Sequence, residues 1–85
     1  MTSQLTPTQQ RFSTLYGHAL IECATKYPEE YWFGPARAME VRDKMIAAIH
    51  RGTFSHDGRA LRATCKALGI KHTRQAILQY WNAKE

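Results

Sequence analysis

The sequence has few cysteines and no long apolar segment. Only two of its 85 residues are cysteine, Cys23 and Cys65, too few for the disulfide framework that is typical of small secreted domains. No run of about 20 apolar residues is present, which argues against a membrane-spanning helix. The first residues, MTSQLTPTQQ, are polar and lack the apolar region of a secretory signal. We therefore expect a cytoplasmic protein that contacts no membrane and keeps both thiols reduced, with a disulfide between them as the alternative.

Short catalytic and metal-binding motifs are also missing. The sequence contains no glycine-rich phosphate loop, no GxSxG and no HExxH, and its histidines and cysteines do not follow the spacing of zinc ligands. His18 and Glu22 stand four positions apart in a helical segment, where such a pair is most often a surface contact. Cys23 falls at an apolar position, where a small side chain is more often packed than nucleophilic. The expectation is a protein that is not an enzyme, with no catalytic residue, metal or cofactor.

Acidic residues are scarce in the last third of the chain. The whole sequence has 12 Lys/Arg and 7 Asp/Glu, a formal net charge of +5. Residues 56–85 hold six of the basic residues and two of the acidic ones, so this third carries a net charge of +4. Three of its basic residues, Arg59, Arg62 and Lys66, recur at i, i+3 and i+7 and would form one edge of a helix. Such an edge is suited to follow the phosphates of a nucleic acid.

The clearest helical pattern lies near the N-terminus. Thr6 can cap a helix, Pro7 suits its first position, and Gln9 completes a capping box. The apolar residues that follow form one stripe at helical spacing: Phe12, Leu15, Tyr16, Ala19, Leu20, Cys23 and Ala24. Gly17 is expected off this stripe, and Pro28 requires the helix to end near residue 26. These signals predict a helix over 7–26, with residues 1–5 frayed.

Proline and glycine mark the ends of the next helices. Pro35 suits the first position of a second helix, and Gly52 suits the left-handed position that ends it. A third helix would be capped by Ser55 or Asp57 and ended by Gly69. The pattern predicts helices over 35–51, 56–68 and 73–83, and no segment alternates as a strand would. The expected fold is all-α, a single small four-helix domain covering residues 1–85.

Residues 27–35, YPEEYWFGP, are rich in aromatic side chains and contain two prolines and a glycine. Such a segment allows a single helical turn at most. Our first interpretation is that Tyr31, Trp32 and Phe33 fold back to close the small core. The alternative is an exposed aromatic patch that anchors a partner protein.

Residues 61–80, LRATCKALGIKHTRQAILQY, resemble the helix-turn-helix family of DNA-binding proteins. The resemblance consists of a small residue, Cys65, four positions before Gly69, of Leu-Gly-Ile at the turn, and of a second helix capped by Thr73 with a polar face. Gln75 departs from the family, which usually has a bulky apolar residue at that position. A helical hairpin that serves only for packing is the alternative.

The resemblance implies that the second helix of this pair enters the major groove of duplex DNA. Its base contacts would be made by three side chains, Arg74 with guanine and Gln75 and Gln79 with adenine. The expected phosphate contacts are those of six residues: Arg59, Arg62, Lys66, Lys71, His72 and Thr73. A single module of this size makes few base contacts, so a homodimer on two half-sites is expected.

A second hypothesis is a non-enzymatic interaction module, such as an adaptor or an inhibitor of a larger nucleoprotein machine. Its partner would be a protein. The working surface would then be the aromatic segment with Tyr31, Trp32 and Phe33, or Leu78 on the polar side of the last helix.

Overall fold

The computed structural model describes residues 5–83, and these residues form four α-helices and no strand. The helices are α1 (Pro7–Lys26), α2 (Ala38–Arg51), α3 (Arg59–Leu68) and α4 (Arg74–Trp81), and a 3-10 turn, η1 (Pro35–Arg37), precedes α2. The prediction of an all-α four-helix domain is confirmed. None of the described helices is both long and apolar enough to cross a membrane.

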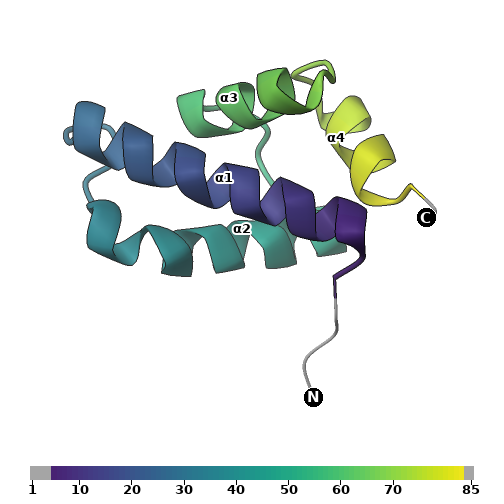
Figure 1. The fold of residues 1–85 in the computed structure, drawn as a ribbon, viewed down its shortest axis with the longest axis horizontal. Coiled ribbons are helices and arrows are strands. Elements are labelled where there is room, and N and C mark those ends of the chain that lie inside the picture. Colours follow the sequence, from purple (N-terminus) through teal and green to yellow (C-terminus); the bar gives the residue numbers. More distant parts are fainter. Residues whose placement is uncertain (1–4, 84–85) are drawn as a thin grey trace.

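The longest helix, α1, lies at the centre of the molecule. Figure 1 shows α2 along one side of α1, α3 along the other side, and α4 beside the N-terminal half of α1. Both α3 and α4 pack chiefly on α1 rather than on one another, and α4 also touches α2. The surface that α1 buries is therefore shared among three partners.

The start of α1 follows the predicted capping box. The Thr6 hydroxyl accepts from the Gln9 backbone N–H, and the Gln9 side chain accepts from the Thr6 N–H, both at 3.1 Å. Gln9 also donates from Nε2 to the Trp81 carbonyl at 2.9 Å and so ties α1 to the end of α4. Residues 1–5 were expected to be frayed, and residues 1–4 lie outside the described residues. For Leu5 the prediction is wrong, because Leu5 packs against the core.

The apolar stripe of α1 supplies much of the core. Six of its seven expected residues are buried and Leu15 is half-buried. The Phe12 ring meets the Trp81 ring edge to face at a centroid distance of 5.8 Å, a favoured arrangement for buried aromatic rings. These contacts make the first and last helices parts of one core.

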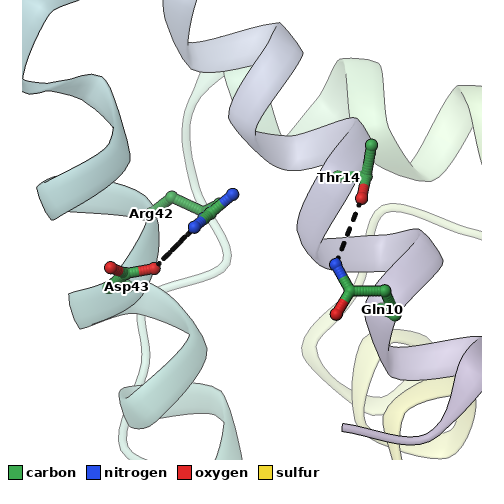
Figure 2. Close-up of polar contacts among 4 residues, drawn as sticks. All are labelled: Gln10, Thr14, Arg42 and Asp43. Atoms are coloured by element: carbon green, nitrogen blue, oxygen red, sulfur yellow. Dashed lines mark hydrogen bonds and ion pairs between the residues drawn. The ribbon is translucent and has the colours of Figure 1, made fainter.

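Gly17, which was expected off the apolar stripe, is buried in the contact between α1 and α2. A Cβ atom at Gly17 would stand 3.0 Å from Met39 Cε and 3.2 Å from Arg42 Cδ. Figure 2 shows the Arg42 side chain beside α1, with its guanidinium 2.9 Å from the Asp43 carboxylate. The same view shows Gln10 hydrogen-bonded to Thr14 on α1. The missing side chain lets Met39 and Arg42 lie directly on the backbone of α1.

The start of α3 differs from the prediction. The helix begins at Arg59 rather than at residue 56, and neither Ser55 nor Asp57 caps it. The Tyr31 hydroxyl instead accepts a hydrogen bond from the Ala60 backbone N–H at 3.1 Å. A residue 29 positions earlier in the chain thus satisfies an amide that no local side chain reaches.

The aromatic segment divides between the core and the surface. Tyr31 is buried at 9% exposure and Phe33 is half-buried, whereas Trp32 is 79% exposed. The segment forms two successive turns, closed by bonds from the Tyr31 N–H to the Tyr27 carbonyl and from the Gly34 N–H to the Tyr31 carbonyl. Our interpretation that Trp32 closes the core is therefore wrong, while that of Tyr31 is confirmed.

Candidate nucleic-acid interface

The turn between α3 and α4 has the predicted geometry. Gly69 adopts the left-handed conformation with φ of 72°, and the Ile70 N–H donates to the Cys65 carbonyl at 3.0 Å, as in a Schellman motif. The Thr73 hydroxyl accepts from the Ala76 N–H at 3.1 Å and caps α4. These local bonds fix the direction in which α4 leaves α3.

The exposed side of α4 carries amide side chains. Gln75, Gln79 and Asn82 are exposed and Leu78 is half-buried between them, while Ile77 and Trp81 on the opposite side are buried. We call the four residues Gln75, Leu78, Gln79 and Asn82 the amide face. Together with Arg74 they line a shallow depression of about 520 Å³. A surface of this kind can donate and accept hydrogen bonds around one apolar contact.

Arg74 is exposed, but its guanidinium is bonded to backbone carbonyls of the protein itself. Its guanidinium donates to the Phe54 carbonyl at 3.0 Å and to the Gly52 carbonyl, and it lies 5.1 Å from the centre of the Phe54 ring. These contacts fasten the start of α4 to the segment that joins α2 to α3. The donors expected to reach guanine are used here instead, so we leave Arg74 out of the base contacts proposed below.

The three residues of the basic edge, Arg59, Arg62 and Lys66, are all exposed on α3. They line a cleft of about 280 Å³ with the C-terminal end of α1, which contributes Lys26 and Tyr27. Lys26 adds a cation to this cleft. The sequence did not place it beside the basic edge, because Lys26 and the first residue of that edge, Arg59, are more than 30 positions apart in the chain. Glu22 lies in the same cleft, 3.7 Å from Lys26.

Arg59 differs from its two neighbours on the basic edge. Its Nε donates to Glu30 Oε1 at 3.3 Å, and its guanidinium stands 4.3 Å from the centre of the Tyr27 ring. This hydrogen bond to the Glu30 carboxylate raises the pKa of Arg59, which stays charged. Arg62 and Lys66 form no ion pair with any other of residues 5–83. Within the basic edge, these two carry the positive charge most available to an anion.

The remaining expected phosphate contacts lie in the turn before α4. Lys71 is exposed. His72 is half-buried, with Nε2 2.5 Å from the His56 carbonyl, so this nitrogen carries the proton and donates. The Thr73 hydroxyl oxygen caps α4. Lys71 is the one of the three that presents a charge to solvent.

Both cysteines are buried and unpaired in the structure. Burial raises the pKa of Cys23 and of Cys65, and a hydrogen bond with Tyr31 lowers the pKa of Cys23 only in part. Because the thiolate is the reactive form, a raised pKa makes both thiols poor nucleophiles. Their place in the α1 and α3 helices is that of packing residues.

The described surface thus contains two polar regions, the amide face of α4 and the basic edge of α3. Comparison of the sequence with protein-family models, of the chain with curated proteins and of the fold with solved structures gives no match. The chemistry of these two regions is the basis for the function considered next.

Proposed function

We propose that the protein binds duplex DNA, with the amide face of α4 in the major groove and the basic edge of α3 on phosphates. One observation carries the proposal: the amide face has two amide side chains on α4, a third on the residue that caps its end and no acidic one, in the third of the chain that has a net charge of +4. Side-chain amides pair with base edges, and lysine and arginine pair with phosphates. The two regions supply both kinds of contact.

The dimensions of α4 suit this role. Its eight residues extend over about 12 Å at 1.5 Å per residue. The major groove is about 12 Å wide and admits an α-helix, whose diameter with side chains is about 10–12 Å. A helix of this length reaches few base pairs, so we propose that two copies bind two half-sites.

The test is a titration of duplex DNA with the protein at two salt concentrations. Arg62→Ala and Lys66→Ala are each expected to reduce the slope of log K against log salt by about 0.9, because each removes one phosphate contact. Gln75→Ala is expected to cost about 1–3 kcal/mol on a preferred sequence and much less on random duplex. Lys44→Ala is the matched control, because it removes the same charge from an exposed position on α2.

Two results would contradict this proposal. The first is no binding of the wild-type protein at micromolar concentration and low salt. The second is an equal loss of slope in Lys44→Ala and in the basic-edge variants, which would show a general effect of net charge rather than a surface for phosphates.

We propose as a second candidate a protein-interaction module, because Trp32 is 79% exposed on a segment anchored by Tyr31. Tryptophan is enriched among the residues that dominate the binding energy of protein interfaces. A partner that is isolated with the wild-type protein should be lost with the Trp32→Ala variant and retained with the Lys44→Ala variant. Binding of that partner should shift the fluorescence emission of Trp32 to shorter wavelength. Retention of the partner by Trp32→Ala would exclude the aromatic segment as the anchor.

A further inference from the structure

The base preference of α4 follows from which of its side chains the structure leaves available, provided that the proposed DNA binding holds. Arginine and lysine are the usual partners of guanine, through its O6 and N7 atoms. The only cation of α4 is Arg74, and its guanidinium is bonded to the Phe54 and Gly52 carbonyls. The four residues of the amide face include no cation. Arg74 lines the same depression and is exposed, but its guanidinium is already engaged by backbone carbonyls, so it is not offered to guanine.

The polar side chains that remain on this face match adenine. Gln75 and Gln79 lie one turn apart on the same side of α4, and Asn82, the residue that caps the C-terminal end of the helix, lines the same shallow depression. Each side-chain amide has one carbonyl oxygen and one NH₂ group. Adenine presents an N6 donor beside an N7 acceptor in the major groove, so an amide can pair with both atoms at once.

Leu78 adds a contact of a different kind. It lines the same shallow depression as Gln75 and Gln79 and is half-buried, so part of its apolar surface faces the space that a ligand would fill. The thymine of an A·T pair presents a 5-methyl group in the major groove, next to the adenine edge. An apolar side chain between amides is thus complementary to the whole A·T pair.

We infer that α4 recognises A·T base pairs, with its amides on adenine and Leu78 against the 5-methyl group of thymine. The exposed cations proposed to contact phosphates lie off this face: Lys71 in the turn before α4, and Arg62 and Lys66 on α3. Their contacts with phosphates strengthen binding to every duplex alike and do not create a base preference.

The experiment compares three duplexes of equal length with the wild-type protein: one of A·T pairs, the same duplex with uracil in place of thymine, and one of G·C pairs. The A·T duplex should bind at least about 10-fold more tightly than the G·C duplex. Uracil should weaken binding about fourfold, because it removes one buried methyl group. Leu78→Ala should bind the thymine and uracil duplexes equally, whereas Leu78→Met, which keeps an apolar side chain, should still prefer thymine.

The outcomes separate this inference from the proposed function. Equal binding of the A·T and G·C duplexes would overturn the base preference and leave DNA binding intact. An unchanged affinity of the wild-type protein for the uracil duplex would overturn the role of Leu78, whatever the stability of the variants. Failure to bind any of the three duplexes would overturn both proposals together.

Discussion

Trp81→Ala is expected to lower the free energy of unfolding by about 3–5 kcal/mol, the usual cost of truncating a buried tryptophan. Trp81 is 1% exposed, packs against the Phe12 ring, and donates from its indole N–H to His50 Nδ1 at 3.3 Å. Its removal would leave a cavity between α1 and α4 as well as an unpaired nitrogen on His50. Urea denaturation followed by circular dichroism measures the loss.

Trp32→Ala is the matched control, because it makes the same substitution on the surface. Trp32 is 79% exposed and its ring contacts only the edge of Phe33 among the aromatic rings described. The expected change in the free energy of unfolding is within about 0.5 kcal/mol. Equal destabilisation by the two substitutions would show that Trp32 is part of the core after all.

Arg74→Ala is expected to lower the free energy of unfolding by about 1.5–3 kcal/mol, the range for hydrogen bonds made by a charged group. It would leave the Gly52 and Phe54 carbonyls without their donor and free the segment between α2 and α3. Arg62→Ala, which removes an exposed arginine with no ion pair among residues 5–83, should change stability by less than about 0.5 kcal/mol.

Arg74→Ala also distinguishes two possible roles of Arg74 in DNA binding. If Arg74 positions α4, its loss should weaken binding to A·T and G·C duplexes by the same factor. If Arg74 contacts guanine, the Arg74→Ala variant should be as stable as the wild-type protein. It should lose affinity only for those sites that contain guanine. That second result would contradict both the internal role and the A·T preference.

The fold was predictable because its helix ends depend on neighbouring residues. Thr6 with Gln9 starts α1, Gly52 ends α2, Gly69 ends α3, and Thr73 starts α4, each through bonds that span three to five positions. The buried stripe of α1 follows from a periodicity that is visible in the sequence. Residue type and local spacing are sufficient for features of this kind.

Several features of the candidate site could not be predicted from the sequence, because they depend on residues that are far apart in the chain. The bond from Ala60 to Tyr31, the bonds from Arg74 to Gly52 and Phe54, and the place of Lys26 beside α3 all join residues 20 or more positions apart. No local pattern marks an arginine that will turn inward. The exposure of Trp32 likewise depends on a tertiary contact, because Tyr31 rather than Trp32 reaches α3. Tryptophan as a residue type can be buried or exposed, so the sequence alone does not decide between the two.

The central place of α1 has a consequence for synthesis of the chain. The bond from Gln9 to the Trp81 carbonyl joins residues 72 positions apart, so α1 is synthesised well before the helix end to which it bonds. Until α4 has been translated, Phe12 lacks the aromatic partner that it meets in the finished protein. At this stage the apolar stripe of α1 lacks part of its cover, and exposed apolar surface on an incomplete chain favours aggregation or binding by chaperones.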